Sequence, residues 1–79
     1  MTTAIDRTEF FQRVEEVLSE PHALDGDTQL STVEGWDSLA FVTFIAMVDD
    51  SYGAAVSVQE LLACKTAEDL AALVERGRQ

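Results

Sequence analysis

The chain has 79 residues, 47% of them hydrophobic and 25% charged, so we expect one small globular domain over residues 1–79 with a modest core. Its formal net charge is −10, and residues 1–60 carry the whole excess, with twelve acidic and two basic residues. A field of this sign repels phosphate backbones and anionic lipids, which argues against nucleic acid or a membrane surface as partner and favours basic protein surfaces. The alternative is that the acidity only keeps a small protein soluble.

A single cysteine, Cys64, excludes a disulfide within the chain and any metal site built from several cysteines. A free thiol fits a reducing compartment. The chain does not open with a charged and then apolar signal sequence, and its apolar stretches fall short of the ~18 residues that span a bilayer. We therefore expect a cytoplasmic protein.

The first predicted helix starts near residue 6. Asp6 and Glu9 stand at the spacing of a capping box, and Ile5 lies where it can pack on Phe10 as a hydrophobic staple. The apolar residues that follow recur at helical spacing and predict a buried face. They are Phe10, Val14, Val17 and Leu18.

A long connection follows the first helix. Pro21 predicts that the helix ends at about Ser19 or Glu20, and residues 21–36 are rich in Asp, Gly, Ser and Thr. A loop of this length in a small domain is usually functional or anchored to the core. The residues expected to anchor it are Leu24, Leu30, Val33 and Trp36.

The second predicted helix covers roughly Ser38 to Tyr52, with Gly53 as its terminator. Residues 39–48 are apolar almost all round, and periodicity alone would allow a buried strand. The length of the run, together with the acidic end at Asp49 and Asp50, exceeds that of a usual strand and favours a helix.

This second helix has more apolar residues than one buried face requires. One stripe consists of Phe41, Phe44, Val48 and Tyr52. Another consists of Leu39, Val42, Ile45 and Ala46. Either neighbours pack on both sides of the helix, or one stripe stays accessible to a partner or an apolar cargo, and both can hold at different ends of the helix.

Two further helices complete the pattern. Ser57 and Glu60 form a capping box for a short third helix that closes at residues 63–65, and Val56 can staple onto Leu61. Thr66 caps a fourth helix, whose apolar face consists of Leu70, Leu73 and Val74. The sequence thus predicts an all-α fold, a four-helix bundle with a short third helix and a long loop between helices one and two.

The stretch from Gly35 to Leu39 is the strongest candidate site. Gly35 marks a turn, and Asp37 or Ser38 can cap the helix that follows. A serine in the first turn lies beside N–H groups that lack intrahelical partners, at the positive end of the helix dipole. An anionic group esterified to Ser38 would be favoured there, although an Asp-Ser pair before a helix is by itself an ordinary cap.

Other candidate sites are weaker. His22, the only histidine, lies in a polar loop where a catalytic pair with Ser38 is conceivable, but a solvated residue fits the pattern better. Cys64 is expected to be a small buried hydrophobe. The alternating residues Asp25, Asp27, Gln29 and Ser31 suggest a calcium loop, but position six is Leu30 rather than Gly and position twelve is Trp36 rather than Glu. We therefore predict no metal site and no catalytic residue.

Gly35-Trp36-Asp37-Ser38-Leu39 and its flanks resemble the acyl carrier proteins of fatty-acid and polyketide synthesis, and the likeness in helix order, acidity and length covers nearly the whole chain. The resemblance implies that Ser38 receives a 4′-phosphopantetheine arm from coenzyme A, whose thiol carries acyl groups as thioesters, and that the protein itself is not an enzyme. Asp37 would support the motif and the approach of the modifying transferase. The implied partner contacts are Trp36, Leu39, Val42 and Ala46.

The same resemblance implies a monomer whose partners are a phosphopantetheinyl transferase and acyl-transferring or condensing enzymes with basic docking surfaces. Where many fatty-acid carriers have acids in the second helix, this chain has Ala40, Thr43 and Ala46, which favours a polyketide or other specialised pathway over fatty-acid synthesis. The alternatives are a peptidyl or aminoacyl carrier, and an unmodified acidic interaction module. The complete helical pattern leads us to expect a freestanding protein.

Overall fold

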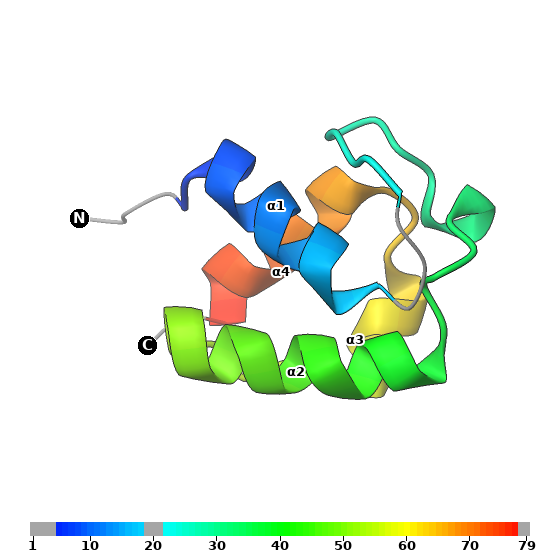
Figure 1. Ribbon diagram of the computed structural model, residues 1–79. Coiled ribbons are helices and arrows are strands. Elements are labelled where there is room, and N and C mark those ends of the chain that lie inside the picture. The colour runs from blue at the N-terminus through cyan, green and yellow to red at the C-terminus, as the bar shows by residue number, and fades with distance from the viewer. Residues whose placement is uncertain (1–4, 19–21, 78–79) are drawn as a thin grey trace.

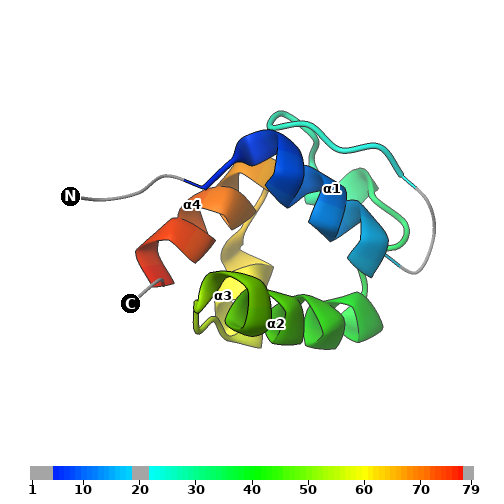
Figure 2. The same ribbon diagram turned by 60° about the vertical axis from the view of Figure 1, so that its left-hand side comes forward.

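The computed structural model describes residues 5–18 and 22–77, which contain four α-helices and one short 3₁₀ turn. These elements are α1 (Arg7–Val17), η1 (Leu30–Thr32), α2 (Ser38–Tyr52), α3 (Val58–Ala63) and α4 (Ala67–Gly77). Figure 1 shows α2 as the longest helix, with α1 and α4 across from it. The 60° rotated view in Figure 2 again places α3 against α2. The predicted four-helix fold with a short third helix is confirmed. No helix in the described ranges is long and apolar enough to cross a membrane.

The start of α1 is fixed by its predicted cap. The Asp6 carboxylate accepts a hydrogen bond from the Glu9 N–H at 3.1 Å, while the Glu9 carboxylate lies against Arg13 at 3.4 Å. Ile5 and Phe10, the expected staple pair, are both buried in one core.

The end of α1 comes earlier than predicted. Leu18 is already extended, with ψ of 140°, and its N–H bonds to the Glu15 carbonyl three residues back, which closes the helix at Val17. The predicted end at Ser19 or Glu20 lies outside the described residues. Proline cannot donate a helical hydrogen bond and disfavours a helical residue before it, so Pro21 gave a limit for the helix end rather than its position.

The long loop is tied to the start of α4 by backbone hydrogen bonds. The N–H groups of Ala67 and Glu68 donate to the carbonyls of Thr28 and Gly26 at 3.0 and 3.2 Å, and the Leu30 N–H donates to the Lys65 carbonyl at 2.8 Å. Two amides at the start of α4 that lack an intrahelical acceptor are thus capped by loop carbonyls. The predicted anchors of the loop are confirmed, since all four pack in or against the core: Leu24, Leu30, Val33 and Trp36.

Side chains complete the cap of α4. Thr66 Oγ1 accepts the Asp69 N–H at 3.3 Å, and the Asp69 carboxylate accepts the N–H groups of Lys65 and Thr66 at 2.9 and 3.1 Å. The Lys65 and Thr66 N–H groups together lower the pKa of the Asp69 carboxyl below its usual value. The predicted cap of the fourth helix at Thr66 is confirmed, and the helix begins at Ala67.

Helices α2 and α3 follow the prediction closely. Gly53 ends α2 in the left-handed conformation, with φ of 63°, and its N–H bonds to the Asp49 carbonyl at 3.1 Å. Ser57 and Glu60 form the reciprocal capping box of α3.

The core gathers one face of every helix. Its fully buried large side chains, each under 2% exposed, are Phe10, Val14, Phe44, Val48, Leu61, Leu70 and Val74. The predicted apolar face of α4 is confirmed. Within the core, aromatic rings from α1 and α2 meet, with Phe10 and Phe44 edge to face at 6.1 Å.

A polar clamp that the sequence did not predict joins α1 to α4. The Arg7 guanidinium contacts the Glu75 and Glu68 carboxylates at 2.7 and 2.8 Å, and the Ile5 N–H also donates to Glu75 at 3.1 Å. The hydrogen bonds that Arg7 donates, first to Glu75 and then to Glu68, raise the pKa of the guanidinium. Because these side chains are partly exposed, we assign the clamp about 1 kcal/mol of stability.

Two valines on α2 provide a matched test of the packing. Val48 is fully buried and Val42 is 64% exposed. Val48→Ala should lower the free energy of unfolding by about 2 kcal/mol, because two buried methyl groups are lost and a cavity remains. Val42→Ala should change it by less than about 0.5 kcal/mol. Urea unfolding checks both values, and equal losses would contradict the assigned orientation of α2.

Candidate functional site

Ser38 is the first residue of α2, and its side chain is exposed. Within the described residues no hydrogen bond engages its hydroxyl, so the oxygen is accessible for chemistry. The N–H groups of Ser38 and Leu39 also find no acceptor among the described groups, as expected for the first residues of a helix. A nucleophilic oxygen and two free donors therefore stand together at the positive end of the helix dipole.

Asp37 is the N-cap of α2. Its backbone is extended, with φ of −129° and ψ of −174°, and its Oδ1 accepts the Ala40 N–H at 3.0 Å. Its carbonyl accepts the Phe41 N–H at 2.9 Å as the first helical hydrogen bond. Of the two capping candidates, Asp37 supplies the cap, which leaves the Ser38 hydroxyl unused.

Trp36 fixes the angle at which the chain enters α2. Its ring packs edge to face on Phe41 at 4.9 Å and on Phe44 at 5.5 Å. Trp36 precedes the cap and Phe41 is the fourth helical residue, so the pair is a hydrophobic staple. The same spacing is present in the sequence, so this staple was predictable alongside those of the first and third helices. Trp36 thus faces the core more than Leu39 and Val42 do.

The exposed apolar side chains gather on two helices. The large hydrophobic residues left exposed in the described ranges are Leu39 and Val42 on α2 and Val58 and Leu62 on α3, with Leu39 68% and Leu62 66% exposed. Ala46, one turn beyond Val42, is also exposed. The two stripes of the second helix therefore differ: the stripe through Phe44 packs inward, and most of the other faces solvent. Each of the two alternatives for the excess of apolar residues on this helix is therefore partly correct: one stripe is packed by neighbours, and most of the other stays accessible.

The remaining candidates lie apart from this constellation. His22 is exposed and lines a surface hollow of about 500 Å³ together with Gln12, Glu15 and Glu16 of α1 and Ala23. Asp25 accepts the Asp27 N–H and the Thr28 hydroxyl at 2.9 and 3.1 Å, and so forms a turn. No cluster of metal-binding side chains occurs within residues 5–18 and 22–77.

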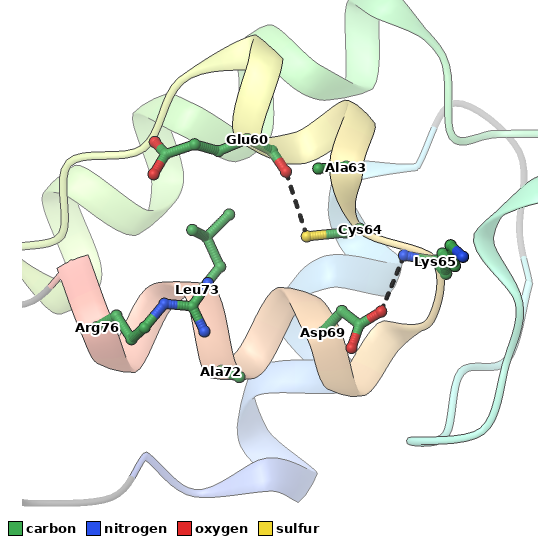
Figure 3. Close-up of a pocket in the computed structure, with 8 residues that line it drawn as sticks. All are labelled: Glu60, Ala63, Cys64, Lys65, Asp69, Ala72, Leu73 and Arg76. Carbon is green, nitrogen blue, oxygen red and sulfur yellow. Dashed lines mark hydrogen bonds between the residues drawn. The ribbon is translucent and has the colours of Figure 1, made fainter.

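Cys64 lies at the end of α3 beside a groove of about 380 Å³. Figure 3 shows its sulfur directed toward the Glu60 carbonyl, to which it donates at 3.4 Å, with Leu73 and Arg76 of α4 along the other side. Burial, followed by the Asp69 carboxylate, raises the pKa of the Cys64 thiol. Cys64 is therefore half-buried rather than buried as predicted, and its raised pKa makes the thiol a poor nucleophile.

Comparisons with known proteins give a family match and a structural match. The sequence profile of the family described as phosphopantetheine attachment site matches residues 8–74 of the chain. Among solved structures, the chain is similar to the solution NMR structure of a holo acyl carrier protein from Geobacter metallireducens. The identity is 27%, the TM-score is 0.65, and the match covers 98% of this chain and 86% of that one. No curated protein matches significantly in sequence.

The cap of α2 can be tested without any cofactor. Asp37→Ala should lower the free energy of unfolding by about 1 kcal/mol, because the Ala40 N–H loses its acceptor. Asp37→Asn keeps an oxygen in place and should stay close to the unchanged protein. Urea unfolding of the three proteins decides, and an equal loss in both variants would mean that the charge, rather than the hydrogen bond, stabilises the helix.

Proposed function

The chain belongs to the family of phosphopantetheine-attachment carrier domains, and on this basis we propose that Ser38 is the residue that bears the arm. Its family makes the protein a carrier rather than an enzyme, with phosphopantetheine as its prosthetic group. The observation that supports Ser38 is its position: an exposed hydroxyl on the first residue of α2, with the cap supplied by Asp37.

The residues around Ser38 suit a phosphodiester. The free N–H groups of Ser38 and Leu39 are donors for phosphate oxygens, and the helix dipole favours the negative charge. Asp37 is negative and adjacent, but its Oδ1 already accepts the Ala40 N–H. When bound, the arm supplies a terminal thiol that carries acyl groups as thioesters.

The folded chain itself contributes by presenting the arm on Ser38 to partner enzymes. Asp37 and the Trp36 staple hold the first turn of α2, so Ser38 projects from a fixed helix end rather than from a mobile loop. A flexible arm from a fixed point gives each partner a high local concentration of substrate. The arm's thiol should also be the more reactive thiol in the molecule, because the pKa of Cys64 is raised.

We further propose that partner enzymes dock beside Ser38 on the exposed residues Leu39, Val42 and Ala46. These side chains are accessible and lie on the helix that begins with Ser38, whereas Trp36 serves mainly as the staple. The net charge of −10 favours partners with basic surfaces around this apolar contact and opposes self-association, so we expect a monomer.

The surface of α2 also bears on the pathway. Residues 38–48 carry no charged side chain, and the residues that face solvent there are aliphatic, small or hydroxyl-bearing. We infer partners whose docking sites are more apolar than those that read an acidic helix, and hence a dedicated polyketide or other specialised pathway rather than general fatty-acid synthesis. We expect this carrier in the cytoplasm, where its unpaired Cys64 stays reduced.

The attachment itself is tested by intact mass. Incubation with coenzyme A and a broad-specificity phosphopantetheinyl transferase should add the mass of one phosphopantetheine unit, and Ser38→Ala should abolish the gain. Ser31→Ala, at an exposed serine of the loop, is the control that should be modified normally. No gain, or a gain that survives in Ser38→Ala, would leave the unmodified interaction module as the better interpretation.

Once the arm is attached, loading tests separate the classes of cargo. Acyl donors should load the holo protein through acyltransferases, whereas aminoacyl donors with adenylating enzymes should not. Preferential aminoacyl loading would identify a peptidyl carrier instead.

The docking surface is tested by the rate of modification. Leu39→Ala and Val42→Ala should each lower the kcat/KM of the transferase by about tenfold, because they truncate exposed apolar contacts beside the reacting hydroxyl. Gln12→Ala, at an exposed position on α1, is the control that should leave the rate unchanged. Since Val42→Ala should not alter stability, a lower rate reports docking; equal rates in all variants would place the docking surface elsewhere.

A further inference from the structure

The inner side of α2 behind Ser38 is closed by packed side chains. Ala40, Phe44 and Val48 follow one another at four-residue spacing on this side, and each is at most 1% exposed. From α3, Leu61 reaches the same core and is also 1% exposed. The interior adjoining the attachment point is therefore occupied by the protein's own side chains.

Aromatic rings in edge-to-face contact occupy part of this interior. Phe44 meets Trp36 at 5.5 Å with an interplanar angle of 86°, and Phe10 at 6.1 Å with an angle of 82°. Trp36, two residues before Ser38, also meets Phe41 at 4.9 Å. An alkyl chain entering beside Ser38 would have to separate rings that already make edge-to-face contacts.

Entry of an alkyl chain into this core would gain little free energy to offset the cost of separating the rings. Protein interiors are close-packed, so extra methylene groups force side chains out of their preferred rotamers. The hollows of about 380, 370 and 500 Å³ described on this molecule are lined by residues of α1, α3, α4 and the loops, and none of these three is lined by a residue of α2.

We propose, resting on attachment at Ser38, that this carrier keeps its cargo outside the helical bundle and accordingly serves short or oxygen-bearing acyl groups rather than long alkyl chains. A long alkyl chain that cannot enter the core stays in water, where each exposed methylene group is unfavourable. A short chain, or one with keto and hydroxyl groups, is well solvated and needs no internal pocket.

The test compares two thioesters on the same protein. The holo protein is loaded with acetyl or octanoyl groups, intact mass confirms each form, and hydroxylamine cleavage is followed with time. Cargo held outside the bundle predicts octanoyl and acetyl cleavage rates within about twofold of each other, since both thioesters are equally exposed. Octanoyl cleavage slower by about tenfold or more would show sequestration and overturn the proposal.

An engineered cavity provides the positive control. Phe44→Ala removes the central ring and should leave an apolar cavity behind Ser38, so octanoyl cleavage should slow by about fivefold or more relative to acetyl cleavage on that variant. Phe44→Leu is the milder variant if Phe44→Ala does not fold, with a smaller change in the same direction. Gln12→Ala, at an exposed position on α1 outside the proposed docking surface, should behave like the unchanged protein.

A final measurement needs no arm. Benzene should shift the core methyl resonances of unmodified Phe44→Ala and not those of the unchanged protein. Benzene binding by the unchanged protein would reveal an open core and overturn the proposal even if the thioesters cleave alike. Absence of any mass gain on Ser38 would instead defeat the attachment on which the proposal rests, so the two failures are distinguishable.

Discussion

The backbone tie between the long loop and the start of α4 determines where Ser38 lies. The carbonyls of Gly26 and Thr28 cap α4, and the Leu30 N–H bonds back to residue 65, so polar groups of the loop are paired rather than left unsatisfied. The hydrogen bonds fix the loop at Leu30, which is also buried, and only seven residues separate Leu30 from Ser38. Between them, the buried Val33 holds the chain against the core. A loop of this length becomes part of the scaffold because its hydrogen bonds and anchors are shared with a helix nearly forty residues further along the chain.

Features that depend on near neighbours in the sequence were predictable, and those that join distant segments were not. The caps at Asp6 and Ser57 and the glycine stop at Gly53 follow from local spacing, and each was identified together with its helix. The clamp from Arg7 to Glu75 spans 68 residues, and no local pattern selects one carboxylate from fifteen as the partner of a given arginine. The 3₁₀ turn in the loop was also not predicted. The N–H groups of Thr32 and Val33 close it locally, and the Leu30 N–H ties it to the distant Lys65 carbonyl.

The candidate site divides in the same way. Ser38 and Asp37 were identified from the sequence, and the structure distinguishes their tasks by giving the cap to Asp37. The apolar surplus of α2 was visible as a puzzle, but only packing could show that Phe44 faces inward while Leu39 faces solvent. Trp36 forms a contact that local spacing predicts, since a bulky residue before the cap and another at the fourth helical position form a staple. Its role became clear from ring contacts rather than from composition.

The staple also makes Trp36 an intrinsic fluorescence probe of the first turn of α2. Trp36 is the chain's single tryptophan, so the indole fluorescence of the protein originates two residues from Ser38. Its ring is held against Phe41 and Phe44. Emission will therefore register fraying of the first turn of α2, while circular dichroism averages over every helix. Where the two signals change together, the attachment end unfolds with the whole bundle; where emission changes first, that end opens on its own, as a locally unstable segment would.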